Sequence, residues 1–272
     1  MPFVALLLCS CTSLPKVADA ENAGFVLQRY QTDTFLLTAY QKLPAQRADE
    51  VHVYIEGDGN SWRSKYRLSD NPTPRHPLGL QLAINDPSPD SVGVVYLARP
   101  CQYTPLENDP LCHPRFWSSH RYAPQVINAF DQVLDQIKQA HPQTKFVLTG
   151  FSGGASVAAL LAARRPDICV LITVAGDLNH ERLNQYHQTT PLHGSLNPTA
   201  VIPQLSDLSQ HHWIGDRDKI VPVFIAQEFV QAVNQNTNKK ATVHVLKGVG
   251  HHAGWKERWP DLLAQSLNNP AK

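Results

Sequence analysis

Gly150-Phe151-Ser152-Gly153-Gly154 is the stretch that decides the fold of this 272-residue chain. It stands between an apolar run, 145–149, that reads as a short buried strand, and an alanine-rich run, 155–164, that reads as a helix. A serine between glycines at such a switch is typical of a tight turn that presents its hydroxyl above the edge of a sheet. The glycines leave room for the turn, and the positive end of the helix dipole favours negative charge beside the hydroxyl.

An acidic residue and a histidine follow in the order that this turn requires if its serine is a nucleophile. Asp218 comes after the predicted strand 211–214, and His251 comes after the predicted strand 241–246, which has β-branched residues in alternation. The carboxyl ends of parallel strands share one edge of a sheet. The sequence therefore predicts that Ser152, Asp218 and His251 converge at that edge.

These three residue types together make a serine reactive. A serine hydroxyl is a poor nucleophile at neutral pH and needs a histidine that accepts its proton. A carboxylate fixes the tautomer of that histidine and stabilises the imidazolium that forms. The anionic intermediate needs two N–H donors, and we expect them from the backbones of Gly153 and Asp58, the latter in the loop after the predicted strand 51–55. We expect the Asp58 side chain to turn away from the anion or to pair with Arg63 or Arg99.

The chain resembles the α/β-hydrolases of the serine-esterase type. The acid loop of that family commonly reads Gly-x-x-Asp-x-x-Val-Pro, and its histidine commonly follows Gly-x-Gly or Gly-x-x. The resemblance implies that Asp218 is the acid and that His251, rather than His252, is the base. It rests on four segments in the family's order, which are 54–59, 150–154, 215–222 and 248–251.

Some alternatives stay open at the sequence level. Asp216, two residues before the preferred acid, and Asp177, at the end of another predicted strand, are alternative acids. The family often opens its oxyanion loop with His-Gly, whereas this chain has Glu56-Gly57. A plain β-turn built on Gly57 and Gly59 is the other interpretation of that loop.

Strands and helices alternate along the chain, which indicates an α/β fold with a mostly parallel central sheet and helices on both faces. We expect one domain at 24–272, with insertions at 99–122 and 177–209 that build the pocket. The predicted strands are 25–31, 34–41, 51–55, 91–97, 145–149, 168–174, 211–214 and 241–246, and the predicted helices are 78–85, 124–140, 155–164, 222–234 and about 255–267.

The expected substrate is a small-molecule ester or another acyl compound. The insertion 177–209 is rich in Asn, Gln and His, whereas a lipase lid offers a broad apolar face. We therefore expect a small or moderately polar ester, hydrolysed through an acyl-enzyme. An acyltransferase or peptidase with the same triad, and a non-catalytic binding lipoprotein on the same fold, are the alternatives.

The N-terminal residues resemble an export signal. The apolar run 3–8 is too short to span a bilayer, and Leu8-Cys9-Ser10-Cys11 resembles a bacterial lipobox with Cys11 as the lipidated residue. No basic residue precedes this run, so an ordinary hydrophobic start is the alternative. We expect 1–23 to be a signal followed by a tether without structure, and the protein to be exported to the periplasm, with a lipid anchor as its contact with the membrane.

Cysteine usage points to the same compartment. Cys101 and Cys112 bracket a short polar loop, and a disulfide there would persist in a periplasm but not in a reducing cytosol. Cys169 lies in an apolar predicted strand and is expected to be a buried free thiol. A zinc site from Cys101, Cys112 and His113 is less favoured because no second pair of ligands completes it.

Composition excludes several classes of function. The net charge of +1 gives no electrostatic reason to expect a nucleic-acid partner. The sequence has no phosphate-binding loop, dinucleotide fingerprint or cofactor motif, so we expect neither a cofactor nor a metal. Its oligomeric state is not indicated by any pattern.

Overall fold

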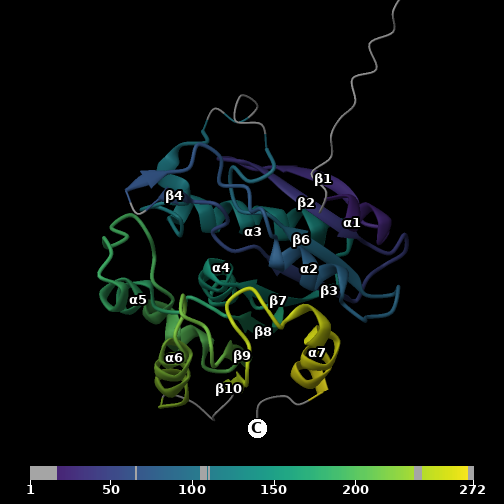
Figure 1. Ribbon diagram of the computed structural model, residues 1–272. Helices are drawn as coiled ribbons and strands as arrows, with labels where there is room; N and C mark the ends of the chain where they lie inside the picture. The colour runs from purple at the N-terminus through teal and green to yellow at the C-terminus, as the bar shows by residue number, and fades with distance from the viewer. Residues whose placement is uncertain (1–16, 65, 105–108, 110, 236–240, 269–272) are drawn as a thin grey trace, which may run out of the picture.

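A central sheet of eight strands organises the described part of the chain (Figure 1). The computed structural model describes residues 17–64, 66–104, 109, 111–235 and 241–268. The two pairs at one edge, β1 with β2 and β2 with β6, are antiparallel, and all other neighbours are parallel. The predicted mostly parallel sheet is confirmed. In spatial order the strands are β1 (Val26–Gln31), β2 (Leu36–Lys42), β6 (Gly93–Leu97), β3 (Glu50–Ile55), β7 (Lys145–Phe151), β8 (Ile168–Val174), β9 (Ser209–Gly215) and β10 (Ala241–Leu246).

Helices cover both faces of this sheet. In β9 the ring of His212 contacts Phe229, while the indole of the next residue, Trp213, donates a hydrogen bond to Ser266. Successive side chains of a strand point to opposite faces, so the helices that carry Phe229 and Ser266 lie on opposite sides. The helices are α1 (Val17–Asn22), α2 (Leu78–Ile84), α3 (Pro124–Ala140), α4 (Gly153–Ala162), α5 (His180–His187), α6 (Val223–Gln235) and α7 (Trp259–Asn268).

The centre of the sheet is buried on both sides, which explains its composition. Every residue of β6, Gly93–Leu97, is buried, and so are all residues of β7 after Lys145. Strands in such positions are near-continuous apolar runs rather than alternating ones. On the face covered by α7, Trp259 packs edge-on against Tyr54 and donates a 3.0 Å hydrogen bond to its hydroxyl.

The segment before the sheet corrects one expectation. Residues 17–22, predicted to be part of an unstructured tether, form α1, and Val17 and Ala20 are buried in the core. Apolar residues three positions apart share one face of a helix, so this turn packs against the domain instead of leaving it. Cys11 and the rest of the predicted signal lie outside the described residues. No described helix has the length and apolar character needed to span a bilayer.

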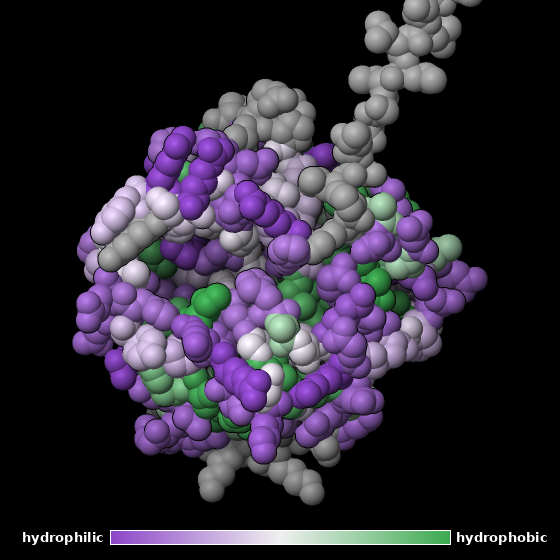
Figure 2. Space-filling model, in the orientation of Figure 1, coloured by the Kyte–Doolittle hydropathy of each residue, from purple (hydrophilic) through white to green (hydrophobic). Residues whose placement is uncertain are grey.

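The two insertions are partly ordered by short helices. The first contains the 3₁₀ helix η2 (Pro114–Trp117), and the second contains α5 and the 3₁₀ helix η3 (Pro198–Leu205). A small hairpin of β4 (Trp62–Ser64) and β5 (Arg67–Leu68) was not predicted. Figure 2 shows that hydrophilic residues cover most of the face in view, with apolar residues in smaller patches.

Candidate active site

The turn after β7 holds Ser152 in a backbone conformation that few residues adopt. Its φ is 50° and its ψ is −120°, and it directly precedes the first residue of α4. Such a conformation costs on the order of 1–3 kcal/mol in a non-glycine residue and is maintained only where the surroundings impose it. The turn leaves Ser152 half-buried at the carboxyl edge of the sheet.

The glycines of the turn are required by close packing. A Cβ on Gly150 would lie 2.5 Å from the Cα of Ala155, and a Cβ on Gly154 would collide with the carbonyl oxygen of Ile55. Neither neighbour is a flexible side chain, so neither can move aside. The sequence pattern Gly-x-Ser-x-Gly thus follows from the contact of the turn with α4 and β3.

Ser152, His251 and Asp218 form one continuous hydrogen-bonded chain. The Nε2 of His251 lies 3.0 Å from the Oγ of Ser152, and its Nδ1 lies 2.8 Å from the Oδ2 of Asp218. His251 and Asp218 are both 8% exposed. With Nδ1 protonated towards the carboxylate, Nε2 is free to accept the serine proton.

The acid and the base are each held by their own loop. The second oxygen of Asp218 accepts the N–H groups of Ile220 and Val221, both at 2.8 Å. This fixes the carboxylate and explains the compact acid loop after β9. The indole of Trp255 donates to the carbonyl oxygens of Gly250 and His251, at 2.9 and 3.1 Å, which ties down the loop after β10.

The alternative acids and the alternative histidine are not part of this hydrogen-bonded chain. Asp216 accepts the N–H of Gly248 at 2.7 Å, and Asp177 accepts the hydroxyl of Tyr122 at 3.1 Å. Neither is bonded to His251. His252 packs against Phe151, and burial followed by the nearby His251 lowers its pKa. Among the described residues, His251 is the histidine bonded to Ser152.

Two N–H groups lie free beside the nucleophile. In the described part of the chain, neither Gly153 N–H nor Asp58 N–H donates to a protein acceptor. The Cα of Gly57 approaches Ser152 so closely that a Cβ on Gly57 would lie 3.2 Å from the serine Cβ. Asp58 Oδ1 abuts Gly153. The structure therefore places Asp58 and Gly153, the residues of the two predicted donors, next to each other and beside Ser152.

The Asp58 carboxylate is neutralised by two arginines. It pairs with Arg99 at 3.2 Å and with Arg121. Burial alone would raise the pKa of Asp58, but the guanidinium groups of Arg121 and Arg99 hold it below its ordinary value. The expected pairing with Arg99 is confirmed. Arg63, the other expected partner, instead pairs with Asp70 at 2.7 Å.

Asp177 and Tyr122 form a second buried polar pair next to the site, which sequence reasoning did not identify as a unit. The tyrosine hydroxyl would lie 2.8 Å from a Cβ on Gly153. Burial and then the charge of Asp58 raise the pKa of Asp177 to about 7. No local pattern could have paired these residues, because 55 positions separate them.

Cys101 and Cys112 form the predicted disulfide, which is confirmed. Their bond rules out the zinc site that would have used both thiolates, and no group of three His, Cys, Asp or Glu among the described residues is placed to hold a metal ion. Cys169 is free, but it is half-buried rather than fully buried. Burial raises the pKa of its thiol to about 11.

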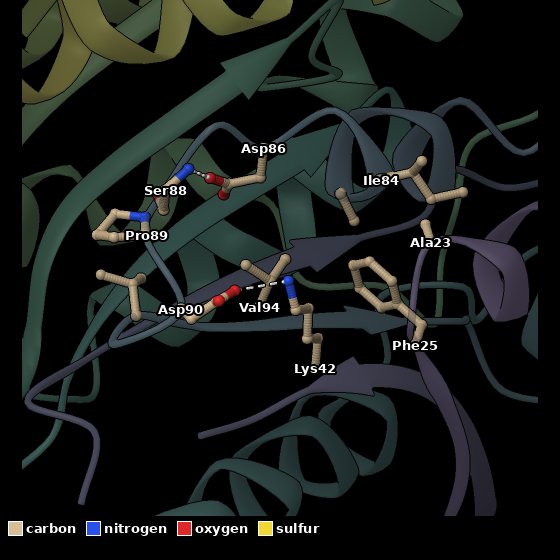
Figure 3. A pocket seen from close by; sticks show the side chains of 11 residues that line it. Ala23, Phe25, Lys42, Ile84, Asp86, Ser88, Pro89, Asp90 and Val94 are labelled. Carbon is tan, nitrogen blue, oxygen red and sulfur yellow. Dashed lines mark hydrogen bonds and ion pairs between the residues drawn. The ribbon is translucent and has the colours of Figure 1, made fainter. Parts of the chain in front are cut away.

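A hollow lies at the opposite end of the strands from the triad (Figure 3). Its wall includes Lys42 and Asp90, joined by a 2.8 Å ion pair, and Asp86, which accepts the N–H of Ser88 at 2.9 Å. Lys42 ends β2 and Val94 is near the start of β6, so this hollow is at the far end of the strands from Ser152. It contributes nothing to the triad.

Comparison with known proteins agrees with this fold. Residues 92–165, which include β6 and the nucleophile turn, match the family described as lipase (class 3). No relative is found among curated protein sequences. An α/β serine hydrolase without a lid from Xanthomonas campestris superposes with a TM-score of 0.53 at 13% identity, over 90% of this chain and 92% of the other.

Two proteins from Pyrococcus species are also similar in structure. An esterase from Pyrococcus furiosus has a TM-score of 0.60 at 14% identity, over 91% of this chain and 94% of its own. This chain has the α/β-hydrolase fold. An acylaminoacyl peptidase from Pyrococcus horikoshii has a TM-score of 0.63 at 12% identity, over 91% of this chain but 42% of its own. At identities this low, the structural likeness shows the α/β-hydrolase fold alone. The reaction has to be argued from the site.

Proposed function

We propose that this protein is a serine hydrolase that cleaves a carboxylic ester or a related acyl bond. The observation that carries the proposal is the hydrogen-bonded chain from Ser152 through His251 to Asp218, beside two N–H groups that have no acceptor among the described residues. An isolated serine at a turn has no need of such an arrangement. The match of 92–165 to a lipase family supports the same reaction class.

The proposed reaction proceeds through an acyl-enzyme. The Oγ of Ser152 bonds to the carbonyl carbon while its proton passes to Nε2 of His251, and Asp218 stabilises the imidazolium. The Gly153 and Asp58 N–H groups bind the oxyanion. Collapse breaks the bond to the leaving alcohol, which takes the proton from His251. Water then attacks the acyl-enzyme with His251 as base, releasing the acid and restoring the serine.

The surface of the second insertion, 177–209, favours a short or moderately polar acyl group. The exposed residues of α5 are Glu181, Gln185, Tyr186 and His187, and Tyr186 is the large apolar one among them. A lid that binds long acyl chains needs a contiguous apolar face. We infer that short esters are preferred to long-chain lipids.

Covalent labelling tests the proposal. A fluorophosphonate probe should label the wild-type protein and should not label Ser152→Ala. A series of p-nitrophenyl esters from acetate to palmitate then measures the acyl preference, and kcat/KM should be highest for the short esters. A folded wild-type protein that neither reacts with the probe nor hydrolyses any ester would support the non-catalytic binding module instead.

We further propose that the protein is exported and anchored through Cys11. The Cys101–Cys112 disulfide supports an oxidising compartment. Fractionation of cells that produce the full chain should find it with the membranes, and Cys11→Ser should release it. Recovery of the wild-type protein in the cytosol with both thiols reduced would contradict this localisation.

A further inference from the structure

Two buried side chains hold Gly57, the residue that precedes Asp58. The carboxyl of Glu56 accepts the Gly57 N–H at 2.9 Å, and the Nε2 of Gln102 donates to the Gly57 carbonyl oxygen at 3.1 Å. Glu56 and Gln102 are each 1% exposed. Gly57 is therefore fixed at both of its polar groups by side chains from different parts of the chain.

The bond from Gln102 has a direct consequence for the oxyanion donor. The Gly57 carbonyl and the Asp58 N–H belong to one peptide group, and the described chain contains no cis peptide bond. In a planar trans peptide the C=O and N–H bonds point in opposite directions. Whatever fixes the Gly57 oxygen on one side therefore aims the Asp58 N–H to the other.

Gln102 is itself held in place. Its Oε1 accepts the N–H of Arg99 at 3.1 Å, which settles the amide orientation and leaves Nε2 to face Gly57. Its own N–H donates to the Arg99 carbonyl oxygen at 3.1 Å. A Cβ on Gly59 would lie 2.6 Å from Nε2, so the amide fits closely against the loop. The preceding residue is Cys101, which is anchored by the disulfide.

We propose that Gln102 is a positioning residue of the hydrolase reaction, and that its amide aims the Asp58 N–H at the oxyanion. The inference rests on the proposed function. Gln102 does not touch the substrate. Its contribution is to prevent the peptide from rotating, so that the donor needs no reorganisation when charge develops.

A nearly isosteric variant tests the role. Gln102→Met keeps the volume but removes both the donor to Gly57 and the acceptor of the Arg99 N–H. Loss of an oxyanion donor costs about 10²–10³-fold in kcat, and a misdirected donor should cost somewhat less, about 10–100-fold. Because the ground-state ester makes little use of this donor, KM should change by less than about threefold.

A second variant separates positioning from packing. In Gln102→Glu the introduced carboxylate faces the Gly57 oxygen and cannot donate when ionised, but its protonated form can. The ratio of its kcat to that of the wild type should therefore rise as the pH is lowered from 8 to 5.5. Groups remote from position 102 titrate alike in both proteins and cancel in this ratio. Gln102→Met has no titrating group at this position, so its ratio to the wild type should not change with pH.

Gln210 supplies a matched control. It is also a fully buried glutamine whose amide donates to a backbone carbonyl, that of Leu205, at 2.8 Å, but it lies at the start of β9. Gln210→Met loses one side-chain hydrogen bond and Gln102→Met loses two, so it should lower the unfolding midpoint less than Gln102→Met, and its kcat should stay within about twofold of the wild type.

The outcomes are distinct. If the wild type is labelled and hydrolyses esters but Gln102→Met keeps its kcat, the positioning role is refuted and the proposed function stands. A low, pH-independent ratio for Gln102→Glu, or an equal loss of kcat in Gln210→Met, also refutes it, since both indicate a packing effect. A wild type that is neither labelled nor active overturns the proposed function, and this inference with it.

Discussion

His251 and Ser152 are separated by 99 positions in the chain, yet the Nε2 of one lies 3.0 Å from the Oγ of the other. The contact is made because β7 and β10 run parallel in the same sheet, so that the loops after them open at one edge. The strained turn presents the serine at that edge, and the loop held by Trp255 places the imidazole beside it.

The choice of acid can be tested by a pair of asparagine variants. Asp218→Asn should lower kcat by about 10⁴-fold, because the amide no longer accepts from Nδ1 of His251 and favours the wrong tautomer. Asp216→Asn changes the same loop but only the bond to Gly248, so its kcat should stay within about threefold. Steady-state kinetics on a short p-nitrophenyl ester decides between them. The assignment is wrong if the two variants exchange behaviours.

A second prediction concerns stability against pH. Burial alone would lower the pKa of His52, but hydrogen bonds to Asp86 at 2.7 Å and Glu50 at 3.0 Å raise it to about 9. A raised folded-state pKa stabilises the protein fully below the unfolded value, near 6.5, and this contribution is lost as the pH rises through 9. The free energy of unfolding should fall by roughly 2–3 kcal/mol between pH 6.5 and 9.5.

Urea unfolding at several pH values measures this loss. His52→Gln keeps a buried polar side chain but cannot titrate, so its unfolding free energy should vary much less over the same range. The other groups that titrate there are common to both proteins. Parallel curves for the wild type and His52→Gln would exclude His52 as the source of the pH dependence.

The sequence predicted the parts of the site that depend on chain order. The elbow glycines, the acid loop and the histidine loop each carry a local requirement for a turn, and the parallel sheet brings their ends together. Only one of the two arginines that pair with Asp58 was predicted. Arg99, at the end of a neighbouring core strand, was found, but Arg121 was not, because its position depends on how the first insertion folds.

The roles of Gln102 and α1 could not be predicted from the sequence either. Gln102 reaches Gly57 across 45 positions, and it directly follows a cysteine that is held by a disulfide. The segment 17–22 is too short to be a stable helix in isolation. It is helical in the protein because Val17 and Ala20 are buried in the core. Such contacts are tertiary, and no periodicity in the sequence reports them.

Reduction of the disulfide should affect both stability and catalysis. A bridge that closes a loop of this length stabilises by about 3 kcal/mol in the chain-entropy model, so the free energy of unfolding should fall by about that amount in Cys101→Ser/Cys112→Ser. Because Cys101 precedes Gln102, kcat should also fall. Cys169→Ser removes the free thiol found among the described residues and serves as the control. An unchanged kcat in the folded double variant would show that Gln102 is held without the bridge.

The final prediction concerns the glycine two residues after the nucleophile. In Gly154→Ala the new methyl group would collide with the Ile55 carbonyl oxygen, which belongs to a central strand and cannot yield. We expect the free energy of unfolding to fall by about 2–4 kcal/mol, since overpacking of this kind displaces backbone as well as side chains.

At Gly250 a Cβ would meet no atom within 4 Å and φ is not positive, so Gly250→Ala should change stability by less than about 1 kcal/mol. Chemical denaturation of the two variants side by side measures the difference. Equal stabilities would mean that α4 can move away from β3, and that the elbow glycines are not required by this contact.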